Sequence, residues 1–172
     1  MNIFFLDKNP IFSARSQCDK HVVKMILETT QMLSTAARRH DFDIGYKTAY
    51  PNHPMTLWVG DSWHNFKWSL LHPISLGTDY NRRYEKIHAC CRILRELTVV
   101  ARTTRGISFK HTPPPLCMPD EFKNDNYVQA FKKYYKNKIY AWKTAPRWYG
   151  ITIEEPFYTG HFKTSPDKKN YV

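Results

Sequence analysis

The chain has few glycines and no long apolar run. Only six of its 172 residues are glycine, while aromatic residues make up 15%. This combination favours packed helices over a sandwich of short, turn-rich strands. No apolar run approaches the roughly 18 residues that a membrane span needs, so no membrane partner is expected. The first residues, MNIFFLDKNP, lack the basic region and long apolar core of a secretory signal, which predicts a cytoplasmic location.

Cysteine and histidine are present without a metal or disulfide pattern. Cys18, Cys90, Cys91 and Cys117 form no CxxC pair and no even framework, so reduced thiols are expected. No two histidines have HxxxH spacing, and none completes a zinc pattern with the cysteines. Neither a metal nor a cofactor is therefore predicted. A glycine-rich phosphate loop, a GxSxG motif and a zinc-deaminase signature are also missing, which removes several enzyme classes.

The excess of positive charge points to a polyanionic partner. The formal net charge is +11 at pH 7, and 42% of the residues are hydrophobic, enough for one good core. Aromatic residues interleaved with Lys and Arg favour nucleic acid over a membrane surface. We expect a single domain over 1–160, followed by a basic tail at 161–172. The oligomeric state is left open.

The stretch CDKHVVKMILETTQMLSTAARRH predicts the central helix, over about 18–39. Its apolar residues spread around most of the helix, which is typical of a helix buried on several sides: Val22, Val23, Met25, Ile26, Leu27, Met32, Leu33 and Ala36. The fold class predicted around it is all-α, a compact helical bundle. A short extended segment at Ile3–Leu6 precedes it, and a proline-rich loop, HTPPPLCMP, comes later.

One polar stripe runs along this predicted helix. His21, Lys24, Glu28, Gln31 and Thr35 recur at i, i+3, i+7, i+10 and i+14, and so share about one quadrant of its surface. A solvent-facing strip with an ordinary Lys24–Glu28 pair would explain it. The alternative is the floor of a cleft, in which Glu28 is an acid/base carboxylate within reach of His21 and Lys24.

Further elements supply candidate phosphate ligands. Asn52-His53-Pro54 predicts a helix start whose free amides favour an anion. In Gly77–Val100, Arg83 lies at the edge of an apolar face, where Glu28 or a substrate phosphate would pair with it. A helix over Asp125–Lys143 carries Lys132 and Lys136 on a basic face. Lys138 lies in its aromatic face, either extending to water or facing the cleft. The tryptophans are read as core more readily than as stacking platforms.

Three blocks resemble a family of short, largely uncharacterised bacteriophage proteins. They are CDKHVVKMILETTQMLSTA, NHPMTLWVGDSWHNFKWSLLH running into YNRRYEKIH, and TPPPLCMPDEF with AFKKYYKNKIYAWK. Together they cover most of the chain. The resemblance implies a phage source without naming a reaction.

The order of elements is also similar, more remotely, to the pyrimidine-dimer DNA glycosylases, which are small helical repair enzymes. Met1, Glu28 and Asn52-His53-Pro54 fall at matching places. The resemblance implies attack of an N-terminal amine on the sugar C1′, an imine intermediate and assistance by Glu28. Because Asn2 is too bulky for the usual removal of the initiator Met, that amine would belong to Met1, or Lys24 would replace it.

These observations predict a phage DNA-processing enzyme, specifically a glycosylase or lyase acting on a damaged or modified base. Two alternatives stay open. One is an enzyme that processes free nucleotides or modified bases, and the other is a non-catalytic protein that binds nucleic acid or a host partner through its basic faces. The base, the strand state and the nucleophile are not assigned.

Overall fold

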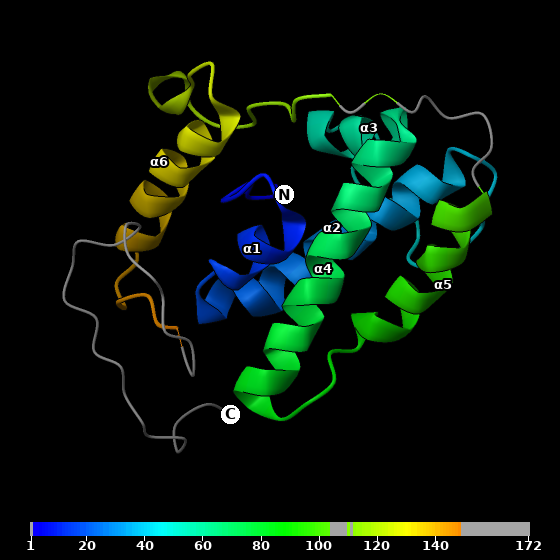
Figure 1. Cartoon of the computed structure of the whole chain (residues 1–172), viewed down its shortest axis with the longest axis horizontal. Coiled ribbons are helices and arrows are strands. Elements are labelled where there is room, and N and C mark those ends of the chain that lie inside the picture. The colour runs from blue at the N-terminus through cyan, green and yellow to red at the C-terminus, as the bar shows by residue number, and fades with distance from the viewer. Residues whose placement is uncertain (1, 104–109, 111, 149–172) are drawn as a thin grey trace.

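The computed structural model describes residues 2–103, 110 and 112–148, and in these ranges all regular elements are helices, without a strand (Figure 1). The all-α prediction is confirmed. In chain order, the elements are α1 (Pro10–Arg15), α2 (Asp19–Arg38), α3 (Pro54–Asp61), α4 (Trp63–Tyr84), α5 (Cys90–Thr103), the 3₁₀ turn η1 (Asp120–Phe122) and α6 (Tyr127–Tyr140). The predicted boundary at 160 and the tail at 161–172 lie outside the described residues.

Helix α2 is the centre of the bundle, as predicted, and contacts α3, α4 and α5. Val22, Ile26 and Leu33 are completely buried. The prediction of apolar burial around most of the helix went too far, because Val23 and Leu27 are 40% and 38% exposed. One side of α2 therefore remains open to solvent, and this is the side that matters for the site.

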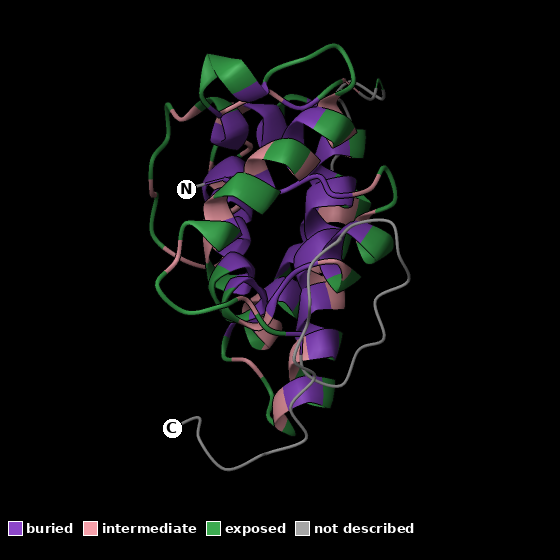
Figure 2. Ribbon diagram, turned by 90° about the vertical axis from the view of Figure 1, so that its left-hand side faces the viewer, coloured by how far each residue is buried: buried purple, intermediate pink, exposed green. Residues whose placement is uncertain are grey.

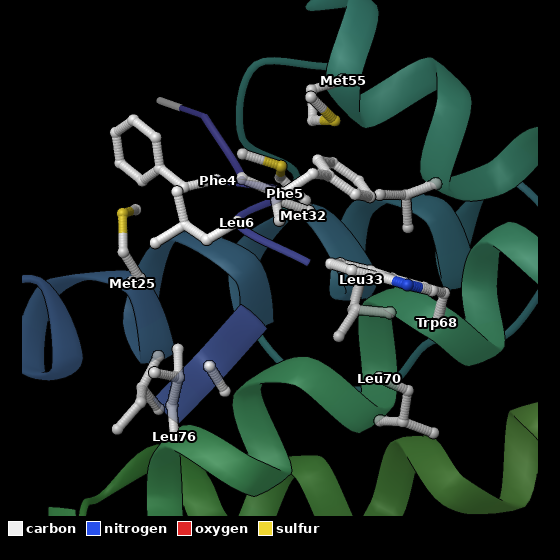
Figure 3. Packing of buried hydrophobic residues seen from close by; sticks show 14 of the residues in the cluster. Phe4, Phe5, Leu6, Met25, Met32, Leu33, Met55, Trp68, Leu70 and Leu76 are labelled. Carbon is white, nitrogen blue, oxygen red and sulfur yellow. The ribbon is translucent and has the colours of Figure 1, made fainter. Parts of the chain in front are cut away.

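The extended segment Ile3–Leu6 passes through the core, with each of its residues at most 2% exposed. Figure 3 shows Phe4 on the side of Met25, whereas Phe5 turns toward Met55 and Trp68. A buried segment outside a helix must find partners for its backbone groups. Ser13 of α1 supplies two, since its hydroxyl accepts from the Leu6 N–H at 3.0 Å and donates to the Phe4 carbonyl at 2.8 Å.

Helix α4 continues through Pro73 and Gly77, and ends where Glu85 adopts a left-handed backbone conformation with φ 55°. The apolar face predicted over Gly77–Val100 therefore belongs to two helices rather than one. Ile87 falls in the link between them and is 73% exposed. The core interpretation of the tryptophans is confirmed for Trp58 and Trp68, which are 4% and 8% exposed.

Helix α6 is attached to the bundle mainly by aromatic rings. Its Tyr135 ring lies 4.8 Å from Phe4, its Phe131 ring lies 5.2 Å from Phe5, and the Tyr135 hydroxyl accepts from the Cys18 N–H at 2.9 Å. Figure 1 shows α6 beside the N-terminal segment, on the side away from α5.

The buried residues of all the helices form one continuous core, and the exposed residues lie on the outer sides of the helices (Figure 2).

The described part of the proline-rich loop, 112–119, runs from α3 past the first residues of the chain. The Trp58 indole donates to the Thr112 carbonyl at 3.1 Å, and the Asn2 side-chain amide donates to the Cys117 carbonyl at 2.9 Å. All four cysteines are free thiols, as predicted. No helix among the described residues is long and apolar enough to cross a membrane.

Candidate functional site

Glu28 lies where the start of the chain crosses α2. Its side chain is only 16% exposed, and its Oε1 is 3.3 Å from Lys24 Nζ, one helical turn earlier. Its Oε2 accepts from the backbone N–H of Asn2, also at 3.3 Å. The predicted contact between Glu28 and Lys24 is confirmed. We call Glu28, Lys24, His53 and the Asn2 backbone the Glu28 site.

Asn2 is held in this position by further hydrogen bonds. Its side-chain oxygen accepts from the Ile3 N–H at 2.9 Å while its amide nitrogen reaches the loop at Cys117. The side chain of Asn2 therefore joins the first residues to the loop, and its backbone N–H adds a third segment, α2, by donating to Glu28. Met1, predicted to be catalytic, lies outside the described residues.

His53 is the N-cap of α3 and belongs to the same neighbourhood. Its Nδ1 accepts from the Met55 N–H at 3.2 Å. Burial lowers the pKa of His53, and the nearby carboxylate of Glu28 acts in the opposite direction. Because the His53 ring occupies the Met55 amide, this helix start is less open to an anion than the sequence predicted. Asn52 is exposed on the preceding turn.

His21 is buried among aromatic rings instead of lying open in a cleft. It is 3% exposed and lies 5.0 Å from Phe4, 4.9 Å from Tyr135 and 4.9 Å from Trp142, between ring centroids. Burial lowers its pKa, the charges of Lys138 and Lys24 act in the same direction, and together they bring it to about 3. His21 is therefore enclosed and a weak base, and it does not lie in the open cleft floor that was one of the two interpretations of the stripe.

The expected pairing of Arg83 with Glu28 is wrong. The guanidinium of Arg83 is fully buried and donates to the Gln17 carbonyl at 3.0 Å and to Asp19 Oδ1 at 2.8 Å, with Asp79 3.7 Å away. A buried guanidinium needs carboxylate and carbonyl partners, and these lie at the start of α2, more than two turns from Glu28. Arg83 joins α4 to α2, and its charge is already balanced without a phosphate.

The predicted basic residues of α6 fall on different faces. Lys132 is half-buried, and burial lowers its pKa while the charge of Asp7 raises it. Lys136 is exposed and lines a shallow pocket of about 540 Å³ with Lys133, Phe122, Asn137, Tyr140 and Ala141. Lys138 lies near enough to His21 of α2 for its charge to contribute to the lowered pKa of that histidine. Only Lys138 is therefore brought close to the polar stripe.

At its far end, the stripe serves the fold. The Thr35 hydroxyl is buried and exchanges hydrogen bonds with Ala49, donating to its carbonyl at 3.2 Å and accepting from its N–H at 3.0 Å. The stripe is thus neither a purely solvated strip nor an open cleft floor along its whole length. It is accessible around Lys24 and Glu28 and closed at His21 and Thr35.

Three groups that lie beside the polar stripe were not predicted from the sequence. They are the Asn2 backbone, Trp142 just after the C-terminal end of α6, and Lys20 at the start of α2. The amide could not be found from a side-chain pattern. Trp142 leaves a signal, because Tyr134, Lys138 and Trp142 recur every four residues.

The Glu28 site joins a carboxylate to an amine at the edge of a largely buried position. An ion pair there keeps the carboxylate ready to stabilise a developing cation or to accept a proton, and keeps an amine close to it. In the described ranges, no group of three or more His, Cys, Asp or Glu side chains is placed to hold a metal ion. Comparison of the chain with protein-family models, curated proteins and solved structures gives no match.

Proposed function

We propose that the chain is a DNA glycosylase/lyase that acts on a damaged or modified base. One observation carries the proposal. The Glu28 carboxylate, 16% exposed, is paired with the Lys24 amine at 3.3 Å and accepts the backbone N–H of Asn2 at the same distance. A carboxylate, an amine and the Asn2 backbone therefore lie together, and this arrangement supports the roles that the remote resemblance to the glycosylases implies for Glu28 and an amine.

The chemistry uses these groups in a balanced sequence. An amine, from Lys24 or from the chain start, gives a proton to Glu28 and attacks the sugar C1′. The bond between C1′ and the base nitrogen breaks as the new C1′–N bond forms, and the base leaves with the electron pair and takes the proton that Glu28 accepted. The Glu28 carboxylate, ionised again, stabilises the positive charge next to C1′ and accepts the second proton of the attached nitrogen. It passes this proton to O4′ as the C1′–O4′ bond opens, which yields the protonated imine.

Borohydride trapping tests the mechanism directly. Wild-type protein mixed with DNA containing an abasic or modified base should give a covalent adduct after reduction. Glu28→Gln keeps the size and polarity of the side chain but removes its charge and basicity, and should slow adduct formation by about 10²–10⁴-fold. Absence of adduct and of base release across a panel of such substrates would exclude the lyase mechanism.

Lys24→Arg separates the two candidate amines. The arginine retains the positive charge beside Glu28 but is not a nucleophile. Loss of the adduct would identify Lys24, whereas an adduct that survives and maps to the first peptide would identify the chain start. Lys67→Arg, at an exposed position of α4, is the matched control and should trap like the wild type.

A second candidate is a non-catalytic nucleic-acid-binding or host-interaction protein, which the pocket beside Lys133 and Lys136 favours. An aromatic ring, Tyr140, and two ammonium groups line one concavity there. This function predicts that Glu28→Gln has no effect. Charge reversal at Lys132, Lys133 and Lys136 would instead abolish the biological activity.

A further inference from the structure

Three side chains of α6 and its C-terminal end form a row that faces α2. Tyr134, Lys138 and Trp142 are spaced i, i+4 and i+8, which places them along one side of the helix over about 12 Å. Both rings are partly buried against the core, so each keeps part of its surface accessible. An aromatic ring, a cation and a second aromatic ring thus follow one another.

Helix α2 completes this surface from the other side. Lys20 Nζ lies 5.0 Å from the centre of the Trp142 ring, and Lys138 Nζ lies 5.7 Å from the centre of the Tyr134 ring. Behind them, the His21 ring meets Trp142 edge-on at 4.9 Å. We call Lys20, His21, Tyr134, Lys138 and Trp142 the α2–α6 face.

The α2–α6 face contains a polar atom that the fold leaves unused. His21 is buried, and its Nδ1 has no hydrogen-bond partner among the described residues. Such atoms are rare in folded proteins because each gives up its hydrogen bonds to water without compensation. Because this atom is enclosed, a ligand with a polar edge, such as a nucleobase, would supply the missing partner only if Trp142, which meets the His21 ring edge-on, moved aside.

Alternating rings and cations match a single nucleic-acid strand. In a single strand the bases are free to stack on aromatic side chains while the phosphates pair with ammonium groups, whereas a duplex keeps its base faces covered. The long stems of Lys20 and Lys138 allow each ammonium to move from a ring to a phosphate. An acidic peptide would engage the lysines but would leave the rings without a role.

We propose that the α2–α6 face binds an unpaired DNA segment, with Tyr134 and Trp142 stacking on bases and Lys20 and Lys138 contacting the phosphates. The face continues along α2, because Lys24 and Glu28 follow Lys20 at successive turns. The bound strand therefore leads into the Glu28 site. This assignment of single-stranded substrate rests on the proposed function, but its binding step can be measured without catalysis.

The test measures the binding of a fluorescent, single-stranded oligonucleotide in the Glu28→Gln background, where turnover does not interfere. Tyr134→Ala and Trp142→Ala should each weaken binding by about tenfold, the loss typical for one stacked base. Tyr134→Phe keeps the stacking ring and should bind like its parent. Tyr140→Ala is the matched control, since it removes the same ring type from a different face of α6 and should have little effect.

Several outcomes would overturn the inference. Unchanged affinity of both alanine variants would do so, as would equal loss for a blunt duplex, or loss that follows Tyr140 instead of Tyr134. Complete competition by polyglutamate, with no effect of the ring variants, would identify an acidic protein partner instead. Because Trp142 packs on His21, each variant is first compared with its parent by thermal unfolding, and Lys138→Gln tests the face without removing a ring.

The inference and the proposed function fail separately. If no substrate is trapped by borohydride yet the ring variants lose single-strand affinity, the α2–α6 face binds DNA and the glycosylase mechanism is wrong. If trapping succeeds while the ring variants bind normally, the mechanism stands and the strand follows another path.

Discussion

A cluster of polar side chains is enclosed where α1, α2 and α4 meet. Gln17 Nε2 lies 3.0 Å from His72 Nε2, and the Gln17 carbonyl accepts from Arg83. His72 also stacks on Trp68, with ring centroids 5.3 Å apart. A buried polar network of this kind holds the helices in one arrangement when its members are paired. Loss of any one member leaves buried polar groups without a partner, which lowers the free energy of unfolding.

The two buried histidines should make stability depend on pH. Burial lowers the pKa of both His72 and His21 to about 3, whereas the unfolded chain titrates near 6.5. Between these values the unfolded state binds more protons, so the free energy of unfolding falls as the pH falls from about 6.5 toward 3. Each histidine contributes a slope of about 1.4 kcal/mol per pH unit.

Replacing His72 isolates its share of that slope. His72→Gln should be less stable at pH 7 because it disturbs the contact with Gln17, but its stability should fall less steeply below pH 6, by about 1.4 kcal/mol per unit. Urea unfolding at several pH values measures this difference. A mutant with the wild-type slope would mean that His72 is already protonated in the folded state.

Arg83→Met tests whether Arg83 is structural. The mutation removes the guanidinium that pairs with Asp19 at 2.8 Å and lies 3.7 Å from the buried Asp79, whose remaining partner is Arg82. Breaking a buried pair of this type typically costs about 3–5 kcal/mol. The free energy of unfolding should drop by about that amount. DNA affinity, measured where the variant is still folded, should stay near the wild-type value. Loss of affinity at unchanged stability would instead return Arg83 to phosphate binding.

At the scale of elements, the helix positions were largely predictable and their partners were not. Helix α2 follows from apolar periodicity and begins within a residue of its expected start, and the start of α3 follows from Pro54. These features are local. The partner of Arg83 depends on how α4 crosses α2, and the pairing of Glu28 with Asn2 depends on the path of a buried segment. Neither leaves a pattern in the sequence.

Helix α4 is a second case in which tertiary packing, and not a local sequence signal, decides the structure. Pro73 and Gly77 are ordinarily signals of a helix end, yet α4 continues through both because packing against α2 and α5 outweighs the local preference. A side chain at residue 77 would meet α5, since a Cβ there would lie 3.1 Å from Cys91 Sγ. Gly77 therefore lowers the helix propensity of α4 but allows α4 and α5 to approach closely.

The effect of Gly77→Ala should depend on residue 91. In the wild-type background the helix-propensity gain of about 1 kcal/mol is offset by the tight contact with Cys91, so the free energy of unfolding should change little. In a Cys91→Ala background the contact is gone, and Gly77→Ala should stabilise by about 1 kcal/mol. Urea unfolding of the four proteins gives this coupling. Equal effects in both backgrounds would show that the helices separate freely.

At the scale of the whole molecule, the charge of +11 attracts any polyanion, and only its distribution can direct one strand to one site. Described lysines lie on several surfaces, among them the α2–α6 face, the pocket beside Lys136 and the exposed side of α4 at Lys67. General attraction would depend on the total charge. A bound strand depends on the few ammonium groups that contact its phosphates.

The salt dependence of DNA affinity distinguishes general attraction by the net charge from contacts between particular lysines and phosphates. Each ammonium that contacts a phosphate releases a counterion, so removing it lowers the slope of log affinity against log salt by about 0.7 for a single strand. The double variant Lys20→Gln, Lys138→Gln should therefore lose about 1.4 from the slope as well as affinity, whereas Lys67→Gln should keep both. Titrating the labelled strand at four or more salt concentrations measures these slopes. If all lysine variants lost the same small amount, the strand would be held by net charge alone, and neither Lys20 nor Lys138 would contact a phosphate.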